Sequence, residues 1–521
     1  MALKLTLMAL ASLPLAQSES VLGVYIFHRH GDRTPKSHAP ANLTSLGAEE
    51  VFLSGSYYRS RYVASDASSP IRGLSHDVAV QSQLSVTAPD DAVLHNSAQV
   101  FAQGLYPPVG RLSAQELANG TEVETPLGGY QYVPVKAVAA SASSTRADAE
   151  NNEWLQGGSG CGNAMVSSNN YFASSEYQQT YSDSRAFYQS LLPVISGTFD
   201  ADEANFKNGY TIFDLINVAR IHNKTIPSSD LLTPETVAKV QDLANIHEWN
   251  LAFNESEPIR AIAGSVLAGQ VLQQLQSILD GKSKSTSPLG IQFGAYASFS
   301  SFFGLAQLQK LSADFTGIVD YASSMAFELV TNSTSSPVSE DDVSVRFLFS
   351  NGAAGAAGNV PVAYPLFGRS EVLLPWSTFA GEMNKFAIGD TKSWCTACGN
   401  STGQCAQYAS GSSSGGDATA ASKSGNGIST AVAGVIGALV TLVVILGIEG
   451  LGLRPGGPAP CQEVLTGGSV HQGRDFWGFQ GLELRVHHSP SLFHNFQLGG
   501  ESRTSRQNFR GKLFCCGSCY E

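Results

Sequence analysis

The chain has 521 residues, of which 43% are hydrophobic and 14% are charged, and its formal net charge is −12. A chain of this length can bury a large core, either in one domain with an insertion or in two domains, so it is not a small scaffold that depends on staples. The negative charge argues against a broad nucleic-acid surface, and any anion site must therefore be built locally.

The first residues have the layout of a cleavable secretory signal, because Lys4 precedes a short apolar stretch and small residues stand at Ala16 and Ser18. A frayed N-terminal helix is the alternative. We predict a signal peptide over residues 1–18 and an exported domain over residues 19–405. Asn-x-Ser/Thr sequons spread through the exported region agree with this and predict a glycoprotein. They begin at Asn42, Asn119, Asn223, Asn254, Asn332 and Asn400.

The exported region opens with "SVLGVYIFHRHG", which predicts a buried strand that stops at Gly31. Thr233 and Pro234 stand in helix-opening order before one predicted helix, and an apolar face from Ile259 to Leu279 predicts the next. "MAFELVT" and "VSVRFLFSNG" predict further strands.

Strands alternating with helices indicate an α/β fold, with a sheet flanked by helices on both faces. The less apolar middle, about residues 110–230, predicts an inserted, mainly helical subdomain.

The cysteines divide into two groups, one before and one after a long apolar stretch. The four in the exported region favour two disulfides over a zinc site, because that compartment is oxidising and no His lies nearby in the sequence. Their three possible pairings stay open. The two groups are Cys161, Cys395, Cys398 and Cys405, and then Cys461, Cys515, Cys516 and Cys519.

The apolar stretch covers residues 428–448, carries no charge and is long enough to cross a bilayer. It follows a polar, flexible linker over residues 406–427. We predict a single transmembrane helix with the exported domain outside, at the plasma membrane or cell surface. Residues 449–521 show no sustained apolar period and are predicted to be disordered. An unprocessed intron or a misjudged gene end is another interpretation of this tail.

The charged stretch at the end of the first strand carries the chemistry. Arg29 and Arg33 present planar forks that match phosphate oxygens, and His30 between them has a ring nitrogen able to attack phosphorus. Gly31 permits close approach of the backbone. A solvated basic turn would not explain a His and a Gly between the arginines, nor the apolar strand that leads into them.

"RHGDRTP" resembles the RHGxRxP signature of the histidine acid phosphatase family, the phytase-like branch of the histidine phosphatase superfamily. "LTSLG" from Leu43, "SAQVFAQGL" from Ser97 and "YASSMAFELV" fit the same family. The similarity covers about residues 20–405 and is strongest to a fungal membrane-tethered subgroup. It implies that His30 becomes a transient phosphohistidine while Arg29 and Arg33 bind the phosphoryl group, with no metal and no organic cofactor.

Two elements of the family's active site, a His-Asp pair and a third Arg, are missing from this sequence. Ala295 and Tyr296 stand where the resemblance places a His-Asp pair that helps hold phosphate and protonates the leaving group. Val93 stands where a third Arg is expected, and the nearby His95 is a partial substitute. Two other acid-bearing pairs lie elsewhere in chain order, His76–Asp77 and His247–Glu248, and the second is the better stand-in.

The expected function is phosphomonoester hydrolysis with impaired turnover, in a single-pass membrane protein. The alternative is a non-catalytic surface glycoprotein that keeps the fold and binds phosphate or a phosphorylated ligand. The sequence leaves open which phosphomonoester is the substrate and what the oligomeric state is.

Overall fold

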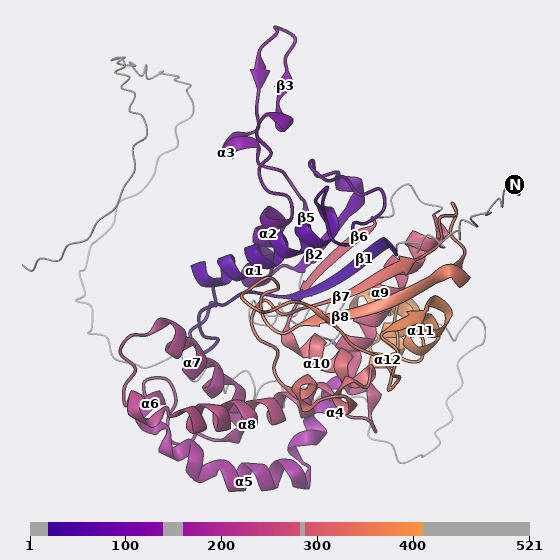
Figure 1. The fold of residues 1–521 in the computed structure, drawn as a ribbon. Helices are drawn as coiled ribbons and strands as arrows, with labels where there is room; N and C mark the ends of the chain where they lie inside the picture. The colour runs from indigo at the N-terminus through magenta and orange to yellow at the C-terminus, as the bar shows by residue number, and fades with distance from the viewer. Residues whose placement is uncertain (1–18, 139–159, 282–286, 410–521) are drawn as a thin grey trace, which may run out of the picture. The chain divides into compact units, whose positions relative to one another are not determined.

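The computed structural model describes residues 19–138, 160–281 and 287–409. Within these residues an eight-stranded mixed sheet forms the centre, in the order β10-β8-β7-β1-β6-β2-β5, with β9 paired to β8 (Figure 1). The strands are β1 Ser20–Arg29, β2 Leu84–Pro89, β5 Val135–Val138, β6 Leu289–Gly294, β7 Ser324–Thr331, β8 Val343–Ser350, β9 Val362–Ala363 and β10 Leu373–Pro375.

The predicted first strand is confirmed as β1, in the middle of the sheet. It runs parallel to β6 and antiparallel to β7. The strand is apolar throughout because both of its faces are covered: Val24 and Ile26 belong to one core, and Tyr25 and Phe27 to the other. The strands predicted from "MAFELVT" and "VSVRFLFSNG" are confirmed as β7 and β8.

Helices cover both faces of the sheet, as predicted (Figure 1). One face packs against α1 and α2, and the other against α9, α10 and α11. Their bounds are α1 Ser45–Tyr58, α2 Ala92–Leu105, α9 Ile262–Asp280, α10 Tyr296–Leu305 and α11 Trp376–Met383. The sheet therefore separates two cores, and its strand ends are the places where a loop can open a site.

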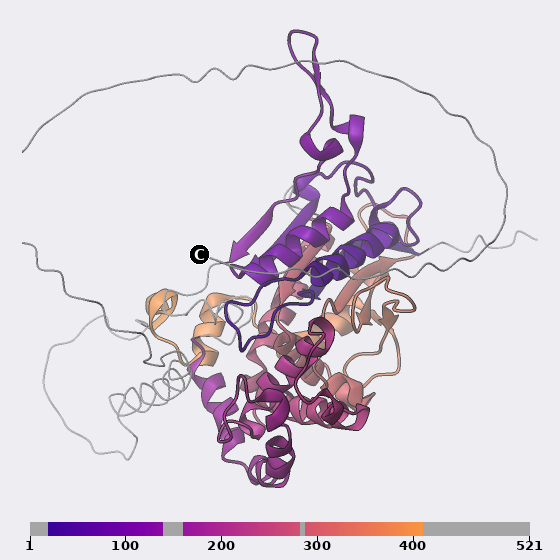
Figure 2. The ribbon, with the colours of Figure 1, turned by 90° about the vertical axis from the view of Figure 1, so that its left-hand side faces the viewer.

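Further helices form a subdomain with its own core of Tyr, Phe, Leu and Ile side chains. They are α4 Gly162–Phe172, α5 Ser175–Ser190, α6 Leu192–Ile195, α7 Gly209–His222 and α8 Pro234–Ala252. Thr233 caps α8 by accepting a hydrogen bond from the backbone of Thr236, as its sequence position predicts. In both views these helices lie at the opposite end of the molecule from the β3–β4 hairpin (Figures 1 and 2).

The extent of this subdomain differs from the predicted 110–230. The segment before residue 139 contains the hairpin of β3 (Gln115–Glu116) and β4 (Glu122–Val123), and then β5, which joins the main sheet beside β2. The helices, in turn, continue to Ala252 at the end of α8. The prediction missed β5 because a four-residue strand with two exposed positions has almost no hydrophobic period.

Two disulfides settle the pairing that the sequence left open. Cys161, at the start of α4, pairs with Cys398 at the end of α12 (Thr391–Cys398), and Cys395 pairs with Cys405. Together with Trp394 these cysteines form a small buried cluster. The first bridge therefore ties the helical subdomain to the C-terminal end of the described domain.

Among the described residues, no helix is both long and apolar enough to cross a membrane. The predicted span at 428–448 lies outside those residues, as do the leader at 1–18 and the tail at 449–521. Of the predicted linker, the structure describes only the short helix α13, Ala406–Ala409.

Candidate functional site

The candidate site lies at the carboxyl end of β1. Arg29 is the partner of Gly294 in the parallel pairing of β1 and β6, so His30 and Ala295 are the next residues along two adjacent strands. β2 ends at the same edge because it also runs parallel to β6. The motif and Ala295, where the resemblance places part of a His-Asp pair, therefore meet at one edge of the sheet.

Two glycines let the motif loop touch helix α1. A Cβ atom on Gly31 would collide with the carbonyl oxygen of Gly47, and one on Gly47 would collide with the backbone of Asp32. From the other side, the Ser97 hydroxyl on α2 accepts a hydrogen bond from the Gly31 N–H at 3.3 Å. Helices α1 and α2 thus fix the loop that carries His30.

The His30 ring is held in one orientation. Its side chain is buried, and Nδ1 lies 2.8 Å from the carbonyl oxygen of Gly31. Because a carbonyl only accepts, Nδ1 carries the proton in the neutral ring, and Nε2 then has the lone pair that a nucleophile needs. The Tyr321 ring, from the loop before β7, lies 5.6 Å from the His30 ring centroid to centroid.

Arg29 is buried between aromatic rings. Its guanidinium carbon lies 4.6 Å from the Tyr321 ring centroid and 5.4 Å from that of Tyr296, and its Nη1 donates to the carbonyl oxygen of Val319. Its Nε has no hydrogen-bond partner among the residues that the structure describes. A buried guanidinium N–H without a partner is suited to an anion.

Arg33 forms a buried ion pair with the helical subdomain. Its Nη2 and Nη1 donate to the two carboxylate oxygens of Asp214 on α7, at 2.8 and 3.2 Å, and Nη2 also donates to the Tyr210 hydroxyl at 3.2 Å. Burial alone would lower the pKa of Arg33, but the phenol oxygen of Tyr210 and the carboxylate of Asp214 beside it more than offset this and raise the pKa above its usual value. Nε of Arg33 has no partner in the described part of the chain.

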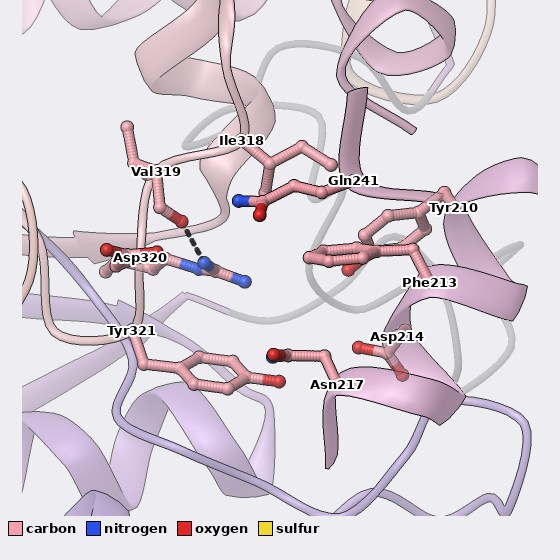
Figure 3. A pocket seen from close by; sticks show the side chains of 10 residues that line it. Tyr210, Phe213, Asp214, Asn217, Gln241, Ile318, Val319, Asp320 and Tyr321 are labelled. Carbon is pink, nitrogen blue, oxygen red and sulfur yellow. Dashed lines mark hydrogen bonds between the residues drawn. The ribbon is translucent and has the colours of Figure 1, made fainter. Parts of the chain in front are cut away.

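A cavity of about 40 Å³, room for roughly three water molecules, lies beside Arg29. Figure 3 shows the Tyr321 hydroxyl directed toward the part of α7 that carries Asn217 and Asp214. The lining consists of one stretch of α7, Gln241 of α8 and the loop before β7. Its members are Arg29, Tyr210, Phe213, Asp214, Asn217, Gln241, Ile318, Val319, Asp320 and Tyr321.

Asp32, between the motif's Gly and second Arg, makes a separate set of contacts. Its fully buried carboxylate lies 2.5 Å from both the Thr44 hydroxyl and Nε2 of His222, the last residue of α7. Its backbone N–H donates to the Glu50 carboxylate at 2.8 Å. Burial raises the pKa of Glu50 to about 7, against a weaker opposing effect of that hydrogen bond.

Three residues stand at or near the positions of the missing family residues: Val93, Ala295 and His95. Val93 is buried in the first turn of α2, where its backbone N–H bonds the Asp91 cap. Ala295 precedes α10 and offers no side-chain cap. Neither supplies a charged group. His95 has an Nδ1 atom that is buried without a hydrogen-bond partner in the described residues.

Tyr296 makes a contact that the order of residues in the chain did not suggest. Its hydroxyl lies 2.5 Å from Oε2 of Glu248, and Oε1 of Glu248 lies 2.7 Å from Nδ1 of His247. The pair on α8 therefore reaches the position where the family's His-Asp pair was expected. By contrast, Nδ1 of His76 lies 3.0 Å from the carbonyl oxygen of Val63.

Sequence reasoning missed Tyr321 and the α7 residues. A signal existed for two of the latter, since Tyr210 and Asp214 are four residues apart and so share one helix face. Among the described residues no group of three or more His, Cys, Asp or Glu side chains is arranged to hold a metal ion.

The family model "Histidine phosphatase superfamily (branch 2)" matches residues 39–350. The chain belongs to this superfamily. The match begins after Pro35, so the RHGDRTP motif and the superfamily assignment are independent observations. Lysosomal acid phosphatase of Xenopus laevis is 23% identical over 348 residues, which are 62% of this chain and 69% of that protein.

The solved structures to which this chain is similar include two phytases. The apo phytase of Hafnia alvei has a TM-score of 0.47 and 12% identity, covering 74% of this chain and 99% of that one. The phytase of Citrobacter braakii has a TM-score of 0.46 and 13% identity, covering 73% and 99%.

Proposed function

We propose that this histidine phosphatase hydrolyses phosphomonoesters through a phosphohistidine formed on His30. The observation that carries the proposal is the contact of His30 Nδ1 with the Gly31 carbonyl, which leaves the lone pair on Nε2, in a motif whose two arginines are also buried. Superfamily membership and the likeness to an acid phosphatase support the same reaction.

In the proposed reaction Nε2 of His30 attacks phosphorus, and Arg29 and Arg33 stabilise the charge on the transferred phosphoryl oxygens. Water then attacks the phosphohistidine, the P–N bond breaks, and phosphate leaves. Both guanidinium Nε groups are buried with no partner among the described residues, so they are available to those oxygens. The scheme uses no metal ion and no organic cofactor.

We propose that turnover is impaired for alkyl esters. An alkoxide must be protonated as it leaves, whereas a phenolate leaves unaided, and general acid catalysis contributes about a hundred- to ten-thousand-fold. Ala295 has no proton to give, and Val93 provides no third guanidinium. Aryl phosphates should therefore be the better substrates.

Trapping the intermediate tests this function. Labelled phosphate from an activated aryl phosphate should appear on the full-length protein, stable to alkali and labile to acid, and should disappear in His30→Ala. Catalytic hydrolysis of the aryl phosphate should depend on His30 in the same way. A correctly folded protein with no aryl-phosphatase activity between about pH 3 and 7 would contradict the proposal.

We further propose a secretory route and a tether at the plasma membrane or cell surface, as in the fungal membrane-tethered subgroup. The leader at 1–18, the apolar span at 428–448 and the two disulfides support this. Four sequon asparagines are exposed and the other two, Asn254 and Asn400, are half-buried, so glycans have access. Endoglycosidase treatment should reduce the apparent mass, and surface labelling of intact cells should reach the domain; failure of both would contradict the route.

A non-catalytic phosphate-binding glycoprotein is the second candidate, favoured by the absence of a His-Asp pair at Ala295 and Tyr296. It predicts phosphate binding with neither a burst nor turnover in the wild type. In that case Ala295→His with Tyr296→Asp should create activity. If the double substitution has no effect on a protein that binds phosphate, the assignment of the missing His-Asp pair to positions 295 and 296 is wrong.

A further inference from the structure

Three side chains connect helix α8 to the phosphate-binding end of the sheet. Nδ1 of His247 contacts Oε1 of Glu248 at 2.7 Å, and Oε2 of Glu248 contacts the Tyr296 hydroxyl at 2.5 Å. An O···O distance of 2.5 Å is at the short end of O–H···O hydrogen bonds, so the phenol and the carboxyl group are close enough to exchange a proton. The carboxyl group is mostly buried, with a side-chain exposure of 15%, so few water molecules compete for these contacts.

Tyr296 borders the proposed phosphate site. Its ring lies 5.4 Å from the Arg29 guanidinium carbon and 5.0 Å from the Tyr210 ring, and the Tyr210 hydroxyl in turn bonds Arg33. Tyr296 also begins α10, directly after the strand that pairs with β1. The phenol therefore lies between a carboxyl group of the helical subdomain and the arginines of the motif.

We propose that Glu248, acting through the Tyr296 hydroxyl, partly replaces the missing acid and supplies the proton to the leaving group of alkyl phosphates, so that their turnover is slowed but not lost. This inference rests on the proposed function. As His30 Nε2 bonds to phosphorus and the P–O ester bond breaks, the leaving oxygen takes the phenolic proton of Tyr296. The Tyr296 oxygen takes the carboxyl proton of Glu248, so the products are a neutral alcohol, a neutral phenol and a carboxylate.

A Tyr alone would be too weak an acid to protonate the leaving group, and the relay overcomes this. An unperturbed phenol titrates near 10, so a phenolate left behind would be costly at acid pH. In the relay the phenol is never left ionised, because the proton it gives is replaced by that of Glu248. The second step reverses the path: water attacks the phosphohistidine, its proton passes through Tyr296, and Glu248 is protonated again.

His247 is a positioning residue in this arrangement. Its ring packs among Phe172, Tyr177 and Phe206, with centroid distances of 6.0, 6.4 and 5.2 Å. Held there, Nδ1 fixes one carboxyl oxygen of Glu248 so that the other faces Tyr296.

Leaving-group dependence tests the relay. The variants are Glu248→Gln, which keeps the shape but loses the acidic proton, and Tyr296→Phe, which keeps the ring over Arg29 and loses the hydroxyl. Rates on glycerol phosphate and on p-nitrophenyl phosphate are compared for the full-length protein. We expect the ratio of aryl to alkyl rate to rise about 100-fold in each variant. Glu248→Asp should recover part of the alkyl rate.

The matched control is Glu235→Gln, an exposed Glu in the first turn of the same helix, which should leave the ratio unchanged. The double variant Glu248→Gln with Tyr296→Phe should be no worse on glycerol phosphate than either single one, because both break the same path.

The outcomes separate this inference from the proposed function. If the wild type hydrolyses the aryl ester through His30 but Glu248→Gln lowers both rates equally, Glu248 is structural and the relay is wrong. If Tyr296→Phe leaves the ratio unchanged, the relay is also wrong. If the wild type lacks His30-dependent aryl hydrolysis, the proposed function itself fails.

Discussion

The guanidinium of Arg33 and the carboxylate of Asp214 form a two-pronged ion pair, at 2.8 and 3.2 Å, across the boundary between the motif loop and α7. Asp214 also accepts the Lys36 N–H at 2.8 Å. A phosphate dianion and this carboxylate therefore compete for the same cation.

Asp214→Asn should bind orthophosphate more tightly than the wild type, because the charge of Arg33 is no longer neutralised. The same change should lower the free energy of unfolding by about 3 kcal/mol, since it leaves a buried charge without its partner. Thermal unfolding with and without phosphate measures both effects. Ile221→Ala, an exposed position on the same helix and outside the cavity, is the control. Weaker phosphate binding in Asp214→Asn would show that the carboxylate assists the ligand.

The burial of Glu50 should make the free energy of unfolding depend on pH. Burial raises its pKa from 4.5 to about 7 in the folded protein, so the unfolded carboxyl ionises first as the pH rises. Its contribution to the free energy of unfolding is therefore full below about pH 4.5 and falls as the pH rises toward 7. The fall should be about 1 kcal/mol after allowing for partial solvent exposure.

Glu50→Gln should remove that fall, which denaturant unfolding at acid and neutral pH will measure. Its exposed neighbour Glu49, replaced by Gln, should keep the wild-type slope. An identical pH slope in Glu50→Gln and wild type would rule out Glu50 as its source.

Gly31→Ala should lower stability by about 1–3 kcal/mol and reduce labelling of His30, because the new Cβ would push the motif loop away from Gly47. Gly381→Ala in α11 is the matched control: nothing lies within 4 Å of an added Cβ there. This helix-interior change should stabilise the protein by about 0.5–1 kcal/mol. Equal melting temperatures for the two variants would contradict the close packing.

The two disulfides should contribute differently to the free energy of unfolding. Cys161–Cys398 joins residues 237 positions apart in the chain, and Cys395–Cys405 joins residues 10 positions apart. Loop-closure entropy predicts that the free energy of unfolding falls by on the order of 5 kcal/mol in Cys161→Ser with Cys398→Ser. In Cys395→Ser with Cys405→Ser it should fall by about 3 kcal/mol. Reversible unfolding of the two double variants should give this order, and the opposite order would contradict the entropic account.

The strongest patterns in the sequence predicted the fold well. A central strand covered on both faces is apolar throughout, and α9 presents a regular apolar stripe, so β1 and α9 could be recognised. The helix α5 lacked such a stripe because its buried side chains are Tyr and Ser rather than aliphatic residues. Its core is built from rings contributed by several helices, and such packing leaves no local period.

The site was predictable only where its residues follow one another in the chain. Arg29, His30 and Arg33 are contiguous with a strand end, but Asp214 is 181 positions from Arg33, and Tyr321 comes from the loop before β7, much later in the chain. Chain order argued against His247–Glu248, yet α8 packs beside α10 and so brings Glu248 to Tyr296. Such contacts depend on how helices are packed, which residue spacing does not encode.

Two consecutive residues of the motif form ion pairs with two different parts of helix α7. Arg33 pairs with Asp214 in the first half of α7, and the adjacent Asp32 pairs with His222 at its last turn. If α7 docked end for end, a carboxylate would face Asp32 and an imidazole would face Arg33. The order of groups, carboxylate before imidazole along the helix and carboxylate before guanidinium along the loop, thus gives the helical subdomain a direction as well as a place. A subdomain grafted from another chain would need that same polarity to close the site.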